Sequence, residues 1–515
     1  MRYLFTMNKQ KFALISVFDK TGIVELAEIL KDQGYGIIST GGTAKTLSEN
    51  NIEVIPIQSV TGNPECFDGR MKTISFQIES GILFDRTNQS HVSQAKELGI
   101  KPIDMVVCNF YPFESKSSIE NIDVGGPTMV RAAAKNFQNV LVIVNPNDYQ
   151  VVIEKMKNKT INEEFRQQMA AKAFSQLSFY DSQVARFFNK ELLPEKITIP
   201  LRKFQNLRYG ENPHQESAIY FEPDKYSAMQ NLKKLHGRDL SLVNVTDVNA
   251  GLESIRFFGD PAAVIIKHNS PCGIALGDTI HQALQRAIAA DPISAFGGVV
   301  VLNKKVDLAT VKEIGKFKDE VKANIDIFAC PGISHDALQY LQKVRKSLGI
   351  YTFGGIKKAK NRLNYKWIDN GLVIQDSDDD IDAGYKNWQV VTKIKPTKSQ
   401  IEQMKIAWKF VTRIRSNTVI ILDKNLPMTR GIGSGQTSRV GGTKIALEQA
   451  GKYCRKGILA SDSFFPFEDS VELAVKHNIG AIVQQGGSIN DKKSIAAADI
   501  AKIPMVFTNR RAFWH

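Results

Sequence analysis

The chain has few cysteines and no long apolar run, and each shortage excludes a class of protein. Only five of its 515 residues are cysteine (Cys66, Cys108, Cys272, Cys330 and Cys454), and none stands in C-x-x-C spacing. This pattern excludes a disulfide framework and a zinc ribbon. No stretch approaches the roughly 18 apolar residues of a membrane span, and the first residues lack the apolar run and cleavage site of a signal peptide. We therefore expect a cytoplasmic protein without a membrane partner.

Three common catalytic signatures are also missing. The sequence has no G-x-x-x-x-G-K-[ST] loop, which argues against ATP-driven phosphoryl transfer. Gly34 and Gly36 precede a predicted strand instead of following one, so they do not form a dinucleotide-binding fingerprint. The zinc deaminase signature is absent because Pro271-Cys272 lacks a second cysteine at the required spacing. Because neither an H-x-E nor a C-x-x-C ligand set is present, we expect no tightly bound metal.

The charge balance is basic, with 67 Lys and Arg against 53 Asp and Glu and a net charge of +14. Such a surface suits nucleic acid, an anionic membrane or small anionic substrates. The positive residues are spread along the chain and do not form a stripe interleaved with aromatic residues. We therefore expect anionic small molecules and no nucleic acid, while a basic nucleic-acid-binding protein stays open as an alternative of a different class.

Strand and helix patterns alternate along the chain. Apolar runs of strand length followed by amphipathic helical stretches predict an α/β protein with a mostly parallel sheet covered on both faces. A long helical pattern over 162–193 ends at Pro194, which places a first domain at 1–195 and a second at 200–515. Within the second, the segment at about 353–396 mixes a lysine cluster with an acidic run. We predict that it is an exposed connection between two similar subdomains.

Polar and glycine-rich clusters follow the predicted strands of the first domain. Ser39-Thr40-Gly41-Gly42-Thr43 lies between a strand and a helix, where small residues and a helix N-terminus can bind an anion. An ordinary tight turn with a capping threonine would have the same sequence. Arg70 and Lys72 beside Thr73 suit a phosphate or a developing oxyanion, although a solvated loop is the plainer interpretation.

Taken in order, these clusters resemble a known family. The runs are SVFDKTG (16–22), STGGTAK (39–45), DGRMKT (68–73), CNFYPFE (108–114), NIDVGGPTMVRAAAKN (121–136), LRYGENPHQ (207–215), IKHNSPCG (266–273), DPISAFGG (291–298), GIGSGQTSR (431–439) and SDSFFPF (461–467). They occur in the order found in the bifunctional AICAR transformylase / IMP cyclohydrolase family of purine biosynthesis. The resemblance covers essentially the whole chain.

The resemblance implies a fold and two activities. The first domain would be a methylglyoxal-synthase-like IMP cyclohydrolase, and the second a duplicated cytidine-deaminase-like AICAR transformylase without zinc. The enzyme would transfer a formyl group from 10-formyltetrahydrofolate to AICAR and then close formyl-AICAR to IMP by expelling water. The family is homodimeric, with the transformylase site shared between subunits. A transformylase with a vestigial cyclohydrolase domain is the alternative within this family.

The resemblance also implies site residues in each domain. In the cyclohydrolase, an acceptor of an N–H proton (Asp123) and cationic or phenolic donors (Lys72, Tyr111 and Lys135) would do the chemistry. The nucleotide would be bound by Ser16, Lys20, Ser39, Gly41, Gly42, Thr43, Arg70, Thr73, Cys108, Asn109, Gly125 and Gly126. In the transformylase, His268 would be the base and Lys267 would hold the oxyanion, while Asn417 would orient the histidine or the formyl oxygen. Arg208, Tyr209, Gly298, Phe465 and Arg511 would bind nucleotide and folate.

The sequence departs from the family at three positions that usually carry histidine, Ser75, Glu79 and Ala512. If Glu79 faced the phosphate, like-charge repulsion would weaken nucleotide binding. Because the presumed anion-binding residues are intact, we predict that ring closure survives these changes.

Overall fold

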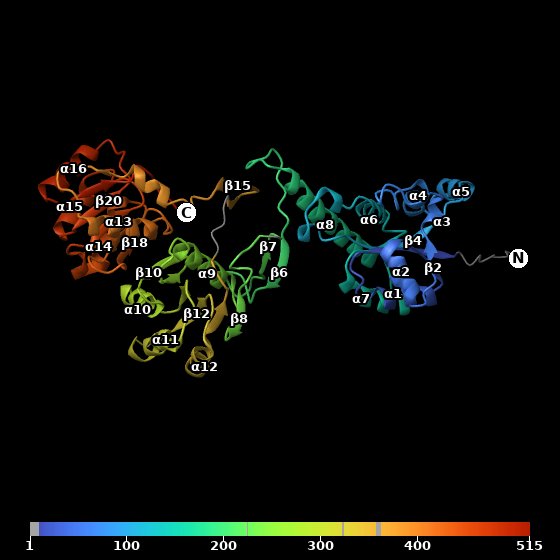
Figure 1. Ribbon diagram of the computed structural model, residues 1–515, viewed down its shortest axis with the longest axis horizontal. Coiled ribbons are helices and arrows are strands. Elements are labelled where there is room, and N and C mark those ends of the chain that lie inside the picture. The colour runs from blue at the N-terminus through green and yellow to red at the C-terminus, as the bar shows by residue number, and fades with distance from the viewer. Residues whose placement is uncertain (1–9, 224, 322–323, 357–361) are drawn as a thin grey trace. The chain divides into compact units, whose positions relative to one another are not determined.

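The computed structural model describes residues 10–223, 225–321, 324–356 and 362–515. The chain forms two compact units (Figure 1). Unit 1 comprises Met1–Arg202 with Glu222–Asp224, and unit 2 comprises Lys203–Phe221 with Lys225–His515. None of the helices in the described ranges has the length and apolar content that crossing a bilayer requires.

Unit 1 is built on a five-stranded parallel sheet. Its strands are β1 (Lys11–Val17), β2 (Tyr35–Ser39), β3 (Ile55–Pro56), β4 (Ile103–Asn109) and β5 (Leu141–Ile143), in the order β3-β2-β1-β4-β5. Leu14 of β1 pairs with Ile38 of β2 on one side and with Val106 of β4 on the other. The strands are continuous apolar runs because helices cover both faces of the sheet.

Two apolar clusters fill the two faces of this sheet. The helices are α1 (Ile23–Asp32), α2 (Gly41–Glu49), α3 (Gln58–Thr61), α4 (Phe76–Leu83), α5 (Gln89–Glu97), α6 (Gly125–Lys135), α7 (Tyr149–Lys157) and α8 (Glu163–Phe188). Leu14 packs in a cluster with α4, α6 and α8. Its neighbours Ala13 and Ile15 pack in a second cluster with α1 and α7. The period-2 alternation of β1 therefore serves two cores, and the predicted α/β class with a parallel sheet is confirmed.

Unit 2 contains two six-stranded sheets with the same strand order. The first is β10-β9-β11-β12-β13-β8, with β8 (Lys233–His236), β9 (Ala262–Lys267), β10 (Ser270–Leu276), β11 (Gly298–Leu302), β12 (Ile325–Cys330) and β13 (Gly349–Thr352). The second is β18-β17-β19-β20-β21-β16, with β16 (Gln389–Val390), β17 (Val419–Leu422), β18 (Thr429–Gly433), β19 (Ile458–Ser461), β20 (Ala481–Gln484) and β21 (Met505–Phe507). Each neighbouring pair of strands in the first sheet has the same relative direction, parallel or antiparallel, as the pair at the same position in the second sheet.

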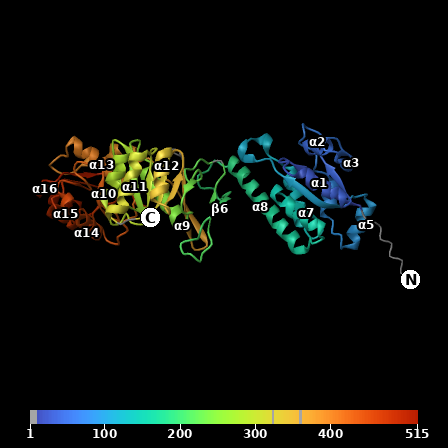
Figure 2. The same cartoon turned by 90° about the horizontal axis from the view of Figure 1, so that it is seen from below.

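The helices of unit 2 repeat in the same order. They are α9 (Leu242–Ile255), α10 (Ile280–Ala290), α11 (Leu308–Val321) and α12 (His335–Val344), then α13 (Lys398–Val411), α14 (Arg439–Ala450), α15 (Asp469–Lys476) and α16 (Asp491–Ile500). Figure 2 shows α10, α11 and α12 grouped on the side of the first sheet away from α9. The predicted duplication of this part of the chain is confirmed, although the sequence contains no short-period repeat that would indicate it.

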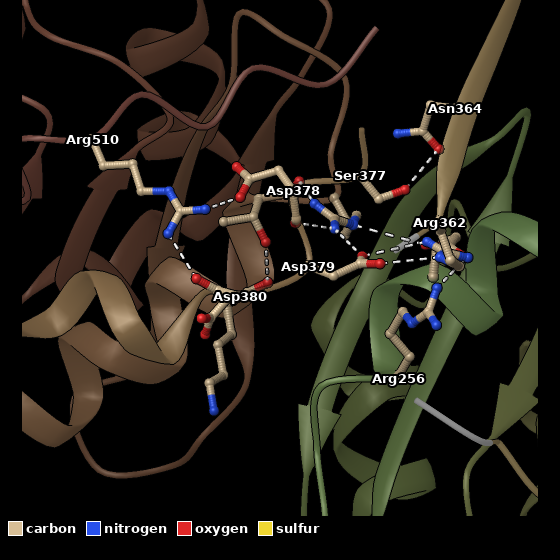
Figure 3. Close-up of polar contacts among 12 residues, drawn as sticks. Arg256, Arg362, Asn364, Ser377, Asp378, Asp379, Asp380 and Arg510 are labelled. Atoms are coloured by element: carbon tan, nitrogen blue, oxygen red, sulfur yellow. Dashed lines mark hydrogen bonds and ion pairs between the residues drawn. The ribbon is translucent and has the colours of Figure 1, made fainter. Parts of the chain in front are cut away.

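Apolar and charged contacts join the two halves of unit 2. One cluster contains buried residues of both α9 and α13. Strand β10 lies beside β18, where the Leu276 N–H donates to Pro427 O at 2.8 Å and Ala275 forms an antiparallel bridge with Met428. Arg362 donates to Glu253 (2.8 and 2.9 Å) and to Asp379 (3.0 Å), as Figure 3 shows in part. We call the junction along β10 and β18 the seam.

The remaining strands form two separate ribbons. These are β6 (Arg202–Asn206) with β7 (Ala218–Phe221), and β14 (Leu363–Ile368) with β15 (Gly371–Asp376). The second ribbon lies in the predicted connection at about 353–396, whose residues 357–361, with most of its lysine cluster, lie outside the described ranges. Asp378 that follows it pairs with Arg510, as Figure 3 also shows.

Candidate functional site

A cavity of about 750 Å³ opens in unit 1 where β1, β2 and β4 end. The carboxyl ends of parallel strands meet at one edge of a sheet, and ligands of open α/β sheets bind there. The lining residues are Ser16, Val17, Phe18, Lys20, Thr40, Gly41, Gly42, Thr43, Asp68, Gly69, Arg70, Lys72, Thr73, Asn109, Tyr111, Ile119, Glu120, Asn121, Ile122, Asp123, Val124, Gly125, Gly126 and Met129.

One wall of the cavity suits an anion. Helix α2 begins there at Gly41, and α6 begins there at Gly125, so two helix N-termini face the same space. A Cβ placed on Gly41 would lie 2.8 Å from Lys72 Nζ, and one placed on Gly42 would lie 3.8 Å from Lys20 Nζ. The ammonium groups therefore lie directly over the first turn of α2. Free N–H groups, the helix dipole and two cations all favour a phosphate at this position.

Carboxylates neutralise two of the cavity's cations. Lys72 Nζ lies 3.0 Å from Glu65 Oε2, and Arg70 Nη2 lies 2.6 Å from Glu120 Oε1. The Arg70–Glu120 pair is solvent-exposed and joins the 66–71 loop to the short 3₁₀ helix at Ile119–Asn121. An exposed pair of this kind contributes little free energy, so Arg70 can turn to an incoming anion at small cost.

A partly buried carboxyl group lies in the same cavity, at the start of α6. Asp123 Oδ1 accepts a hydrogen bond of 2.9 Å from the Gly126 N–H, and the Asp123 N–H donates to the Tyr180 hydroxyl at 2.7 Å. Burial raises the pKa of Asp123, and the hydrogen bond from Gly126 opposes this only in part. A carboxylate with a raised pKa is a better proton acceptor than an exposed one. Nearby, the Tyr111 ring packs edge-on against Phe18, with centroids 4.5 Å apart.

Two lining side chains shape the cavity by holding its backbone. Thr43 Oγ1 accepts from the Val17 N–H and donates to Val17 O, both at 3.0 Å. Asn109 Oδ1 accepts from the N–H groups of Phe18 and Asp19 at 2.8 Å, and its Nδ2 donates to Asp19 O at 3.0 Å. These bonds tie the end of β1 and the loop after it to the first turn of α2 and to the end of β4.

Most residues expected around the nucleotide line this one cavity, but Ser39, Cys108 and Lys135 do not. Ser39 is buried, and its hydroxyl donates to Ile15 O at 2.7 Å. Cys108 is also buried, which raises the pKa of its thiol well above the usual range. Lys135 is exposed at the last position of α6, about 15 Å along the axis from the first turn at a rise of 1.5 Å per residue.

The positions that replace the family's histidines lie away from the cavity lining. Ser75 caps α4, where its hydroxyl accepts from the Ile78 N–H at 3.1 Å. Glu79 lies in the first turn of the same helix, and burial raises its pKa to about 7. Repulsion between Glu79 and a bound phosphate therefore has no basis in the cavity's geometry. Ala512 is buried, and its N–H donates to Asp462 O at 2.9 Å.

The second candidate set lies at the seam of unit 2. Strand β9 ends at Lys267 and β10 begins at Ser270, so His268 and Asn269 alone form the turn, with φ of 57° and 60°. Two left-handed residues are the mark of a type I′ hairpin turn. Lys267 Nζ lies 5.9 Å from the centre of the Phe296 ring. The two candidate groups therefore project from one tight turn.

Asn417 approaches this turn from the other half of unit 2. Ser270 Oγ and Ser434 Oγ are 3.2 Å apart across the seam, and Gln436 O, two residues further on, accepts from Asn417 Nδ2 at 2.9 Å. Asn417 Oδ1 accepts from Arg439 Nη2 at 2.7 Å. The structure thus brings Lys267, His268 and Asn417 to neighbouring segments, and it adds Ser434 and Arg439, which belong to the glycine-rich run 431–439.

The other residues expected in unit 2 have varied surroundings. Arg208 Nη2 donates to the Tyr209 hydroxyl at 2.8 Å. Arg511 is exposed, and its guanidinium lies 4.5 Å from the centre of the Phe513 ring. Gly298 is buried, and a Cβ there would lie 3.0 Å from Ala295 O. Phe465 is 0% exposed and belongs to the core of the second half, so its ring has no surface open to a ligand within the single chain.

Sequence reasoning missed the apolar part of the unit 1 lining, namely Val17, Phe18, Ile119, Ile122, Val124 and Met129. Their only signal is that they adjoin the polar clusters. In the described ranges, no three His, Cys, Asp or Glu side chains are grouped so as to hold a metal ion.

Comparisons with known proteins agree with this geometry. The family described as "AICARFT/IMPCHase bienzyme" matches residues 133–449, and the MGS-like domain family matches residues 22–128. The chain is 43% identical over 519 residues to the bifunctional purine biosynthesis protein PurH of a Thermoanaerobacter species, covering 98% of this chain and 100% of that protein. It is 42% identical over 520 residues to the protein of the same name from Bacillus mycoides, with the same coverage.

A solved structure, the crystal structure of ForH, is 34% identical, covers 35% of this chain and 100% of its own, and has a TM-score of 0.33. The two full-length relatives and the two matched families confirm the resemblance drawn from the motifs. The chain belongs to the AICARFT/IMPCHase bienzyme family.

Proposed function

We propose that the two reactions of this bienzyme are divided between the units, with ring closure in the unit 1 cavity and formyl transfer at the Lys267–His268 turn. The chain catalyses the last two steps of IMP synthesis, formyl transfer from a folate donor to AICAR and then closure of formyl-AICAR to IMP. The observation that carries the assignment of unit 1 is the pair of helix N-termini that face one cavity together with Lys20, Lys72 and the carboxyl group of Asp123.

Ring closure joins the carboxamide nitrogen to the formyl carbon and releases water. In our assignment the phosphate lies at the start of α2 beside Lys20, and Asp123 accepts the proton that leaves the carboxamide nitrogen. Lys72 and Tyr111 donate hydrogen bonds to the formyl oxygen while its bond to carbon breaks. This oxygen leaves as water, which carries away one proton from the carboxamide nitrogen and one from the formamide nitrogen. Lys135 has no role in this scheme because it lies outside the cavity lining.

Formyl transfer joins the AICAR amine nitrogen to the formyl carbon and breaks the bond from that carbon to the folate nitrogen. We assign the proton of the amine to His268 and the oxyanion of the tetrahedral intermediate to Lys267. Asn417 positions the loop that faces them, and Arg208, Tyr209 and Arg511 contact the ligands. The donor would be 10-formyltetrahydrofolate, and the protein would act as a cytoplasmic homodimer that completes this site.

A crossed pair of variants tests the division. We expect Lys267→Ala and His268→Ala to lower formyl transfer by about 10² to 10⁴ because each removes one acid–base or charge-stabilising group. The same variants keep the closure of supplied formyl-AICAR at the wild-type rate, whereas Asp123→Ala does the reverse. Steady-state rates of the two half-reactions measure both effects. His281→Ala is the matched histidine control. In the wild type, His281 lies on α10, and its Nε2 is 2.8 Å from Glu313 Oε1.

Wild-type formyl transfer in both turn variants would remove the assignment to unit 2. A wild-type chain that makes formyl-AICAR but no IMP would make unit 1 vestigial. Thermal stabilisation by an oligonucleotide and none by AICAR would favour the nucleic-acid-binding alternative.

A further inference from the structure

We propose that Asp247 is a positioning residue for formyl transfer, because its buried carboxylate holds the two-residue turn that carries His268. Asp247 lies in the second turn of α9 and is 5% exposed. Its Oδ1 accepts the Asn269 N–H at 2.7 Å. The inference rests on the proposed role of His268 and extends it to a residue with no contact to the reacting atoms.

The turn needs an external partner to keep its shape. His268 and Asn269 are both left-handed, a conformation that the contact between Cβ and the backbone disfavours in a non-glycine residue. The ladder of β9 and β10 ends at the pair Lys267–Ser270, so it leaves the turn's own N–H groups unpaired. A partly buried N–H without an acceptor adds a further penalty. Asp247 supplies the acceptor and so offsets both costs.

Asp247 is itself held at a fixed position. Helix α9 begins with a capping box formed by Ser241 and Asn244. One turn after Asp247, Gly251 lets the helix lie flat on the sheet, since a Cβ there would overlap the Val301 side chain. Close packing of this kind leaves little freedom to slide. The sheet therefore fixes α9, α9 fixes the carboxylate, and the carboxylate fixes the turn.

The charges around the carboxylate agree with this role. Burial raises the pKa of Asp247, while the hydrogen bonds from the turn and the positive charge that His268 can carry oppose the rise. The protein thus keeps a carboxylate in a costly environment where its partners are the backbone and side chain of the turn. The charge of Asp326 adds to the rise, and the charge of Asp247 in turn helps to raise the pKa of the nearby Cys272 thiol.

Three Asp247 and Asp307 variants in the full-length enzyme test the proposal. We expect Asp247→Ala to lower kcat for formyl transfer by about 30- to 100-fold, as for a reacting group displaced by roughly 1 Å. KM for AICAR should change by less than about threefold. Asp247→Asn, which keeps an oxygen acceptor, should recover most of the lost rate. Asp307→Ala removes a comparable bond, from the Thr310 N–H at 2.9 Å in the same half, and should leave kcat unchanged.

Closure of supplied formyl-AICAR by unit 1 of the same variants reports whether the chain is folded. Loss of formyl transfer with closure intact, together with rescue in Asp247→Asn, supports positioning. An Asp247→Ala enzyme with more than half of the wild-type kcat overturns the proposal, as does an Asp247→Asn enzyme as slow as Asp247→Ala. Equal loss of both activities would show a purely structural role. His268→Ala assayed in parallel separates the inferences, because full formyl transfer in that variant removes the assignment of His268 itself.

Discussion

Glu79 is one of the three positions where the sequence departs from the family. Its surroundings lower the free energy of unfolding when its carboxyl group is ionised. Its Oε1 is buried and has no hydrogen-bond partner among the described residues. Burial alone raises its pKa to about 7. The native state therefore holds a proton at pH values where the unfolded chain has released it. Stability contributed in this way is present below the unfolded pKa of 4.5 and is lost as the pH rises toward 7.

We expect Glu79→Gln to abolish this part of the pH dependence. Between pH 5 and pH 8 the wild-type chain should lose about 1–2 kcal/mol from this group, after allowance for solvent screening of a partly buried side chain. The variant should therefore gain stability at pH 8 and little at pH 5, measured by urea unfolding followed at both pH values. Exposed Glu28→Gln is the control and should leave the difference between the two pH values unchanged. A Glu79→Gln chain with the wild-type pH dependence would contradict this account.

Most polar residues that the sequence places around the nucleotide line the unit 1 cavity, and this has a physical reason. Gly41, Lys72 and Asp123 are residue types that a phosphate and a proton acceptor require, so their presence after strand ends is informative. Ile119 and Met129 line the same cavity, but an apolar side chain has the same pattern in a cavity wall as in a core. Nothing in the sequence indicates that the Ser39 hydroxyl donates to Ile15 O of β1 and does not face the cavity.

In the proposed function, the phosphate of the nucleotide lies at the start of α2. Gly41 is left-handed, with φ of 53°, and a Cβ there would displace the Lys72 ammonium. Gly62 after α3 is also left-handed, with φ of 71°, but has no atom within 4 Å of its Cβ position. Alanine variants of the two glycines therefore distinguish the effect of backbone strain from the effect of displacing the Lys72 ammonium group.

We predict that Gly41→Ala weakens IMP binding at unit 1 at least about tenfold, which corresponds to the loss of roughly 1.4 kcal/mol. Gly62→Ala should bind IMP as the wild type does, although both variants lose about 1–2 kcal/mol of stability from strain. Isothermal titration with IMP and urea unfolding measure the two quantities. Equal affinities in the two variants would show that Lys72 does not depend on the glycine.

Element order was predictable because strands and helices alternate with different periods, but the short 3₁₀ helix at Ile119–Asn121 was not. Three residues carry no periodicity, and the contacts of this segment, such as Arg70–Glu120, are made with a part of the chain that is distant in sequence. The same limit applies to the seam, where Ser270 and Ser434 meet although they are far apart in sequence.

At the scale of the whole molecule, each unit has its own apolar cores. Among the described residues, the apolar clusters of unit 1 contain no residue of unit 2, and those of unit 2 contain none of unit 1. The two units should therefore unfold as separate cooperative transitions. The predicted domain boundary at 195–200 separates the same two sets of apolar clusters. A chain divided there would keep the apolar cores of each unit intact.

We expect IMP to raise the unfolding temperature of unit 1. At a ligand concentration of 100 Kd the gain is about 2.7 kcal/mol, which amounts to roughly 5–10 °C for a domain of this size. Scanning calorimetry of the full-length chain with and without IMP measures the shift. Gly41→Ala should reduce it at the same IMP concentration, and Gly62→Ala should not. A single transition that moves as a whole would show that the units unfold together.

The antiparallel approach of β10 and β18 sets equivalent edge strands of the two halves against each other. Two copies that meet through equivalent antiparallel strands have the local symmetry of a two-fold dimer, although here both copies belong to one chain. The connections next to this junction nevertheless differ between the halves. The link between β9 and β10 is the turn that carries His268, whereas the link between β17 and β18 spans residues 423–428.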